Sequence, residues 1–148
     1  MTNKLKCVSF EIPGEPCGKG RPRFTGRIAY TPKRTASYEN LVKLAYKQKN
    51  RDFSFGTTPI AMTVEACLAI PKSASKKKKE QMQDGKILPT KKPDFDNIAK
   101  IIGDALNGIA YHDDSQIVGF QFLKRYDERP RVCVFIQEVT SIDDFWEP

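Results

Sequence analysis

Hydrophobic and polar residues follow one another along the first half of the chain in patterns typical of strands and one helix. Residues 4–12 alternate and are rich in β-formers, which predicts a strand. A Gly- and Pro-rich loop is expected over 13–23, with a short hairpin over 24–30. Apolar residues three and four apart predict a helix over 35–48. A continuous apolar run over 59–70, closed by Pro71, predicts a central strand.

The second half continues with weaker and then stronger signals. The polar stretch 72–82 could form a short solvated helix, and 86–93 resembles an extended connector. A clear helix begins near Asp94 or Asp96 and ends at Asn107-Gly108, a pair typical of a helix C-cap. Residues 116–126 and 131–138 predict two further strands. We therefore expect one small α+β (mixed α/β) domain over 1–148, with a mixed sheet of about four strands and two principal helices.

The predicted helix after residue 94 has two different faces. Its apolar residues recur three and four positions apart and define one face for the core: Ile98, Ile101, Ile102, Ala105, Leu106 and Ile109. At 100° per residue, Asp96, Lys100 and Asn107 share the opposite face, with Asp104 beside them. The helix should therefore pack on one side and present charged groups on the other.

Charge is distributed unevenly over the 148 residues, whose net charge is +7. Residues 1–92 carry 20 Lys and Arg against 7 Asp and Glu, whereas residues 93–148 carry 5 against 11. A basic surface suits a polyphosphate partner, because each neutralised phosphate releases condensed counterions. Concentrated carboxylates would repel that partner unless a cation lay between them, so the combination indicates a divalent metal.

Several classes of protein are disfavoured. No apolar stretch approaches the roughly 18 residues that span a bilayer, and the N-terminus has no apolar signal-peptide region, which predicts a cytoplasmic protein without membrane contact. The four cysteines form no C-x-x-C pair, so neither a zinc ribbon nor a dithiol redox motif is expected. Cys7, Cys67 and Cys133 lie in apolar runs, where free thiols are expected to be buried.

The densest chemical signal is the segment Lys91-Lys92-Pro93-Asp94-Phe95-Asp96-Asn97-Ile98-Ala99-Lys100. One Asp at a helix start is explained by N-capping or by the helix dipole. Capping does not explain a second carboxylate, a lysine one turn later and the pair Asp113-Asp114 after the same helix. Hard oxygen ligands of this kind suit Mg²⁺ or Mn²⁺. From spacing alone, capping and metal binding both stay open, and Lys100 fits either a water-orienting role or a surface ion pair.

Other motifs fail on their residues. In an EF-hand register, Ile98, Ala99 and Ala105 would occupy positions that require a ligand, Gly and Glu. A P-loop starting at Gly14 is one residue short. His112 is the single histidine, so histidine-based zinc sites and Ser-His-Asp systems are disfavoured, and no small-molecule cofactor is indicated.

The motifs Lys92-Pro93-Asp94-Phe95-Asp96-Asn97-x-x-Lys100, Asp104-Ala105-Leu106-x-Gly108 and Asp113-Asp114-x-Gln116-Ile117 resemble the RusA-type Holliday junction resolvases. The opening Pro13-Gly14-x-Pro16 and Lys19-Gly20-Arg21-Pro22-Arg23-Phe24, followed by Tyr30-Thr31-Pro32, is similar to that family as well. The resemblance covers most of the chain. It implies a homodimeric, Mg²⁺-dependent endodeoxyribonuclease of bacterial or phage recombination and repair, which nicks two opposed strands of a four-way junction.

The resemblance also assigns residues. Asp94, Asp96 and Asp114 match the metal-binding aspartates of the family, and Lys100 matches its essential lysine. Asp113 is a neighbouring candidate ligand. The choice of Asp114 over Asp113 depends on the register of the Asp-Asp-x-Gln motif. Mn²⁺ could replace Mg²⁺. The residues expected to hold DNA phosphates are Lys19, Arg21, Arg23, Arg27 and Lys92. Phe24 and Tyr30 are interpreted as local packing residues rather than base-stacking groups.

Two rival functions stay open at this point. One is a DNA-binding module without catalysis, whose acidic half contacts a protein partner. The other is a metal nuclease for RNA or flapped DNA. The sequence does not determine the preferred cut site, the number of metal ions, the role of the Lys76–Lys79 run or that of the C-terminal tail.

Overall fold

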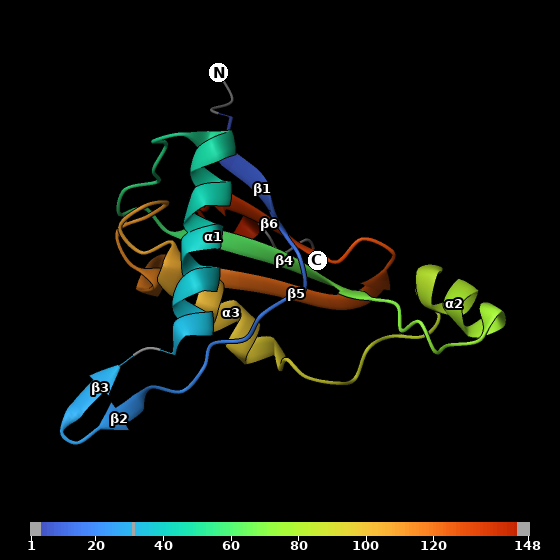
Figure 1. Cartoon of the computed structure of the whole chain (residues 1–148). Helices are drawn as coiled ribbons and strands as arrows, with labels where there is room; N and C mark the ends of the chain where they lie inside the picture. The colour runs from blue at the N-terminus through green and yellow to red at the C-terminus, as the bar shows by residue number, and fades with distance from the viewer. Residues whose placement is uncertain (1–3, 31, 145–148) are drawn as a thin grey trace.

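The computed structural model describes residues 4–30 and 32–144, apart from the side chain of Tyr30. The elements follow the expected order along the chain (Figure 1). They are β1 (Cys7–Pro13), β2 (Arg23–Thr25), β3 (Ile28–Tyr30), α1 (Lys33–Asn50), β4 (Ile60–Ala69), α2 (Lys76–Gln83), α3 (Phe95–Ala105), the 3₁₀ turn η1 (Asp114–Gln116), β5 (Ile117–Asp127), β6 (Arg131–Glu138) and the 3₁₀ turn η2 (Ile142–Asp144). The predicted packing role of the Tyr30 side chain, and residues 145–148 of the C-terminal tail, lie outside the described part of the structure.

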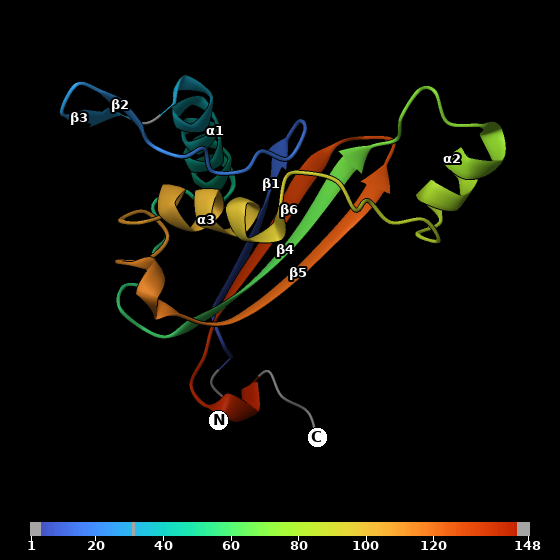
Figure 2. The same ribbon diagram turned by 90° about the horizontal axis from the view of Figure 1, so that it is seen from below.

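Four strands form the main sheet in the order β1-β6-β4-β5. β4 and β5 are parallel, whereas β6 is antiparallel to both β1 and β4. Helices α1 and α3 pack on the same face of this sheet, and α2 stands beyond the ends of β4 and β5 (Figure 2). The predicted single α+β domain with a mixed sheet and two principal helices is confirmed.

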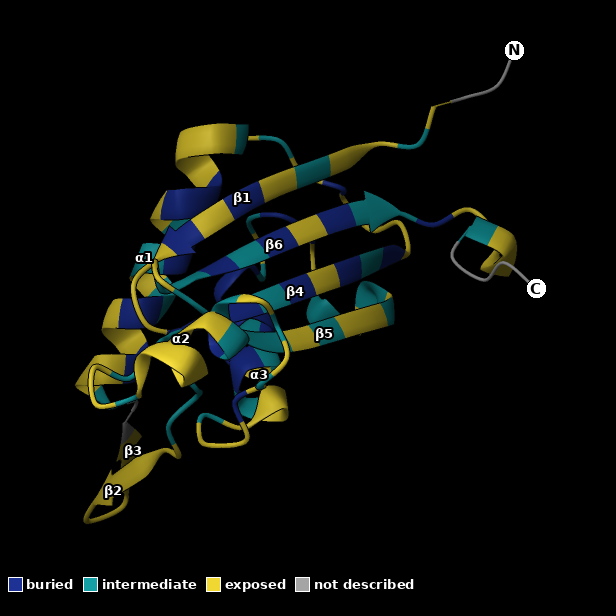
Figure 3. Cartoon of the chain, turned by 90° about the vertical axis from the view of Figure 1, so that its right-hand side faces the viewer, coloured by how far each residue is buried: buried dark blue, intermediate teal, exposed yellow. Residues whose placement is uncertain are grey.

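Strand β4 shows how the sequence selects one face of the sheet. Its residues Ile60, Met62, Val64, Ala66 and Leu68 are at most 2% exposed and join the core under the helices. The residues between them point to the other face, where no described helix covers the strands and exposed positions alternate with buried ones (Figure 3). Successive side chains of a strand point to opposite faces, so the apolar spacing of β4 fixes which side receives α1 and α3.

Helix α3 buries the stripe that its sequence predicts. Ile98, Ile101, Ile102 and Leu106 are all fully buried, and each such side chain contributes about 1.5–3 kcal/mol relative to an exposed one. This packing fixes the rotation of α3 about its axis. The opposite face, with Asp96 and Lys100, is therefore held towards solvent.

Two expectations about individual side chains are wrong in part. Cys7 is exposed and Cys133 half-buried because both belong to the uncovered side of the sheet, whereas Cys17 of the loop is buried beside Tyr38. Phe24 is 70% exposed, because the β2–β3 hairpin stands away from the core, so it is not a packing residue.

None of the helices described has both the length and the apolar character needed to cross a bilayer.

Candidate active site

Asp94 occupies the N-cap position of α3, but its carboxylate does not cap the helix. Its backbone is extended (φ −71°, ψ 150°), and the side chain accepts no hydrogen bond from the first turn. Its ion pair is with Lys92, at 3.1 Å, and both side chains are well exposed. Such surface pairs are worth about 0–1 kcal/mol. The carboxylate of Asp94 is therefore free for another partner, which helix capping alone does not explain.

The backbone that leads into Asp94 is fastened to the sheet by Lys124 of β5. The Lys124 ammonium donates to the carbonyl of Pro93 at 2.9 Å and also to the carbonyl of Lys91. The ammonium of Lys91 lies 5.9 Å from the ring centre of Tyr126. The start of α3 is thus positioned from β5, by a lysine that sequence reasoning did not single out.

The N-terminal loop passes close to the same helix end. The backbone N–H of Lys19 donates to the carbonyl of Asn97 at 2.9 Å. A Cβ added at Gly18 would lie 3.1 Å from the side chains of Asn97 and Pro93, and one at Gly20 would lie 2.8 Å from the Thr35 hydroxyl. The glycines therefore permit close packing of this loop against α1 and α3, a role that their loop-forming character alone does not reveal.

This packing creates an open groove between the N-terminal loop, the start of α1 and the connector before α3. Four of the five expected phosphate-binding residues line it, namely Lys19, Arg21, Arg23 and Lys92. Arg34 and Lys91 add two cations that sequence reasoning missed, and Asp94 lies on its wall. Arg27 lies at the β2–β3 turn, outside this groove.

Lys19, one of these candidate phosphate contacts, is held by acidic groups. Its ammonium lies 2.5 Å from Glu39 and 3.2 Å from Asp104, and the side chain is 21% exposed. Burial alone would lower the pKa of Lys19, but its hydrogen bonds with Glu39 and Asp104 outweigh this and raise the pKa. Lys19 thus ties the loop to α1 and α3, and contact with a phosphate stays a prediction.

The turn after α3 gives its two neighbouring aspartates different surroundings. Asp113 is the N-cap of η1, and its carboxylate accepts from the backbone N–H of Ser115 at 3.1 Å. The Gln116 side chain accepts from the Asp113 N–H at 2.7 Å and donates to the carbonyls of Gly56 and Thr58 at 2.8 and 2.9 Å. Asp113 therefore stabilises the turn, and Gln116 anchors it to the loop before β4.

Asp114 instead faces α3. A Cβ added at Gly103 would lie 3.8 Å from the Asp114 carboxylate, and the buried hydroxyl of Tyr111 donates to the Gly103 carbonyl at 2.7 Å. Partial burial raises the pKa of Asp114, and the neighbouring carboxylates of Asp113 and Asp104 raise it further. Crowded acidic oxygens of this kind are what a bound cation would stabilise.

The acidic residues thus form two groups along the exposed side of α3. Asp94 and Asp96 lie at its start, and Asp104 with Asp114 lies two turns later, about 12 Å along the axis at 1.5 Å per residue. Lys100 is one turn from each of Asp96 and Asp104. Within 4–30 and 32–144, no three His, Cys, Asp or Glu side chains are grouped closely enough to form a ready cation cage. The donors fit in chemistry, because Mg²⁺ takes one or two carboxylates and completes its shell with water and substrate phosphate.

Comparisons with known proteins identify the family of the chain. The family model for endodeoxyribonuclease RusA matches residues 13–137. The chain is 40% identical over 143 residues to the uncharacterized protein YqaN of Bacillus subtilis (strain 168), covering 93% of this chain and all of that protein. It is 30% identical over 130 residues to the crossover junction endodeoxyribonuclease rusA of Lactococcus phage r1t, covering 87% of this chain and 92% of that protein. The resemblance drawn from the aspartate motifs is confirmed, and the chain belongs to the RusA family of endodeoxyribonucleases.

Proposed function

We propose that this endodeoxyribonuclease acts as a homodimer, depends on Mg²⁺, and resolves four-way DNA junctions by nicking two opposed strands. The observation that carries the proposal is the basic groove, which is lined by Arg21, Arg23, Arg34 and Lys91. The wall of this groove includes Asp94, whose carboxylate does not cap α3. The cations hold the phosphate backbone without reading its sequence. The acidic side of α3 begins where that backbone would pass. The cytoplasm, where such DNA occurs, is the proposed location.

Asp94, Asp96 and Asp114 are the proposed metal-binding residues. Asp114 is preferred to Asp113, because the carboxylate of Asp113 already accepts a hydrogen bond within its own turn. Divalent ions bound at the two acidic groups would polarise the scissile phosphodiester, acidify a water ligand and stabilise the leaving oxygen. Lys100, between the two acidic groups, would offset negative charge on the phosphate and orient the attacking water. Arg21 and Lys92 would hold the phosphates that flank the cut.

The homodimer is proposed to form along the first half of β5. Among the described residues, β5 has a strand partner, β4, on one side only. Its second half is approached by α2 and the connector, through the contacts of Arg125 with Gln83 and of Lys124 with Pro93. Its first half, residues 117–123, contains no charged residue.

The apolar side chains of that half support a second copy of the chain as its partner. Phe120 is 39% exposed and stacks beside Phe122 with ring centres 6.3 Å apart, and Phe122 lies 6.2 Å from Phe95. In a two-fold interface, residue i of one copy contacts residue j of the other and the reverse, and residues near the axis meet their own copies, so an uncharged edge avoids like-charge repulsion. Phe95 lies between Asp94 and Asp96, so this interface would bring two sites together for two opposed strands.

The oligomeric state tests this interface. Phe120→Lys places like charges across the two-fold axis and should convert the protein from dimer to monomer in analytical ultracentrifugation. Leu44→Lys is the matched control, because Leu44 is a 54% exposed apolar residue of α1. A Phe120→Lys protein that stays dimeric would exclude β5 as the interface.

Cleavage of a labelled synthetic four-way junction, beside linear duplex of the same sequence, tests the function. We expect paired nicks in opposed strands of the junction with Mg²⁺ or Mn²⁺, and none with EDTA. Junction binding without cleavage in either metal would identify a DNA-binding module instead. Equal cleavage of flapped DNA or RNA would identify a nuclease of another substrate class.

A further inference from the structure

Helix α2 carries four consecutive lysines, Lys76–Lys79, and all four are exposed. Consecutive residues of a helix are 100° apart, so these side chains spread over most of its circumference. Within 4–30 and 32–144, none of the four forms an ion pair within 4 Å, although Glu80 is one turn from Lys76. The helix therefore presents about four uncompensated positive charges in a length of about 12 Å.

The position of α2 is fixed by contacts of its last turn. The Ser75 hydroxyl caps the start of the helix by accepting from the backbone N–H of Lys78 at 3.3 Å. In the last turn, Met82 is buried, the Gln83 carbonyl accepts from the Arg125 guanidinium at 3.3 Å, and the Gln83 side chain accepts from the Glu128 N–H at 3.2 Å. The lysines are thus held at a defined place relative to β5.

A second groove lies between α2 and the ends of β4 and β5, and Lys72, Lys76 and Lys79 share its lining with Glu80, Asp84 and Glu128. Leu68 lines the basic groove and its neighbour Ala69 lines the second groove. The two grooves therefore lie on opposite faces of the sheet at the end of β4. Both views of the ribbon place the start of α3 between the β2–β3 hairpin on one side and α2 on the other (Figures 1 and 2).

We propose that α2 is a second phosphate-binding limb, which holds a different arm of a branched DNA from the arm that lies in the basic groove. The proposal rests on the proposed function. A linear duplex runs in a single direction, so it can contact the basic groove or α2 but not both at once. At a branch point two duplexes diverge, and a junction can occupy both basic surfaces at once. The limb would then contribute affinity that only branched substrates obtain.

The test is binding of the four-way junction and of linear duplex in EDTA, across a range of salt concentrations. The variant Lys76→Gln/Lys77→Gln/Lys78→Gln/Lys79→Gln removes the charges of α2. The matched control, Lys4→Gln/Lys6→Gln/Lys47→Gln/Lys49→Gln, removes the same charge at the start of β1 and the end of α1, at the opposite end of the molecule (Figure 1). Circular dichroism and a thermal melt of both variants check that they are folded.

We expect the α2 variant to lose at least about tenfold in junction affinity at moderate salt, with a salt slope lower by about 0.9 for each phosphate contact removed. Its affinity for duplex should change no more than that of the control. Junction affinity and slope equal to those of the control would overturn the proposal. An equal loss for duplex and junction would overturn it too, since α2 would then serve any DNA.

Failure of the proposed function would be visible separately. A wild-type protein that neither prefers the junction nor cuts it with Mg²⁺ would overturn the resolvase function itself. A wild-type protein that does both, beside an α2 variant that matches the control, would leave the resolvase intact and remove only the limb.

Discussion

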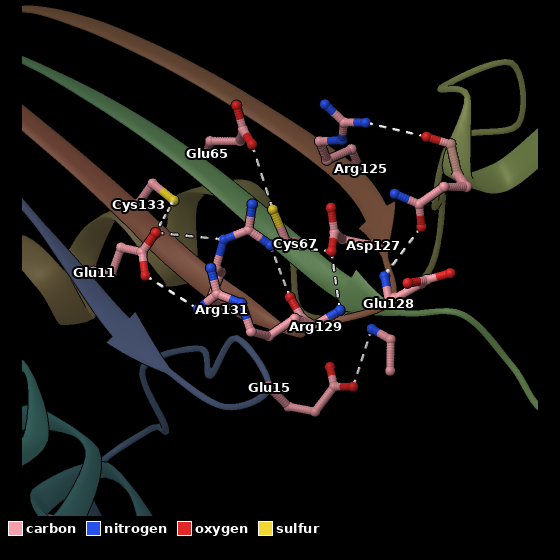
Figure 4. A network of polar contacts seen from close by, with 12 residues as sticks. Glu11, Glu15, Glu65, Cys67, Arg125, Asp127, Glu128, Arg129, Arg131 and Cys133 are labelled. Carbon is pink, nitrogen blue, oxygen red and sulfur yellow. Dashed lines mark hydrogen bonds and ion pairs between the residues drawn. The ribbon is translucent and has the colours of Figure 1, made fainter.

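Charged residues gather both at the turn between β5 and β6 and on the exposed side of α3. The two regions differ in how completely these charges are paired. At the turn, acids are matched with cations (Figure 4). Asp127 accepts from the Arg129 N–H at 2.9 Å and lies 3.1 Å from the Arg131 guanidinium, and Glu11 lies 3.2 Å from Arg129. These hydrogen bonds and ion pairs lower the pKa of Asp127 and of Glu11.

On α3 the acids face one another. Asp114 lies beside Asp104, and its pKa is raised. In the part of the chain that the structure describes, neither Asp96 nor Asp114 has a cation within 4 Å. Paired charges fasten β1, β5 and β6 together. On α3, Asp94 pairs with Lys92 and Asp104 with Lys19, so the contrast with the turn rests on Asp96 and Asp114.

Removing a carboxylate from the exposed side of α3 should give the largest effect. Asp96→Asn should lower junction cleavage at least about 100-fold, because a ligand for the ion that stabilises the transition state is lost. Binding in EDTA should be equal or tighter, since repulsion of phosphate falls. The measurement is single-turnover cleavage, with Asp52→Asn, an exposed acid elsewhere, as control. Loss of folding and binding together would instead favour a structural role for Asp96.

Asp113 and Asp114 allow a capping aspartate and a proposed metal-binding aspartate to be compared within one turn of chain. Asp113→Ser keeps a side chain that can cap η1 and should change cleavage by less than about threefold. Asp114→Ser removes the carboxylate that faces α3, and the loss should be at least about 100-fold. Cleavage rates of the two proteins, measured side by side, decide the assignment. The reverse order would make Asp113 the ligand.

Gln116 affects both stability and the proposed site, because its side chain holds the turn that contains Asp114 against Gly56 and Thr58. Gln116→Ala leaves the carbonyls of Gly56 and Thr58 and the N–H of Asp113 without their partner, which should cost about 2 kcal/mol in the free energy of unfolding. Cleavage should fall about 10–100-fold through displacement of Asp114.

Urea unfolding and the Mg²⁺ dependence of cleavage separate the two effects of Gln116→Ala. A positioning role predicts that more Mg²⁺ is needed for half-maximal rate, at temperatures where the variant is fully folded. An unchanged Mg²⁺ requirement would show that Gln116 matters for stability alone.

The smallest effect is expected at the β5–β6 turn. Asp127→Ala should lower the free energy of unfolding by about 1 kcal/mol at pH 7 and leave junction cleavage unchanged. The pKa of Asp127 is lowered in the folded protein, so its contribution is present above the ordinary carboxyl pKa of about 4 and is lost as pH falls through the folded value. Urea unfolding at pH 7 and pH 3 should therefore show the difference from wild type shrinking at pH 3.

The sequence determined the elements and the chemistry. The spacing of Ile98, Ile101 and Ile102 predicted both the helix and its buried face, because an apolar stripe has one favourable side on which to pack. The continuous apolar run over 59–70 predicted the central strand that became β4. The spacing of the aspartates left capping and metal binding open, and the resemblance of their motifs to the RusA family indicated a nuclease.

Only the tertiary structure decided which charged side chains are paired with one another. Nothing in the local sequence states that Lys19 is paired with Glu39 and Asp104, that Lys124 holds the carbonyl before Asp94, or that Asp113 caps a turn while Asp114 faces Gly103. These partners lie up to 85 residues apart in the chain, since Lys19 and Asp104 meet only after α1 and α3 pack on one face of the sheet. Pairing depends on distance in space, and local patterns of residues do not contain that distance.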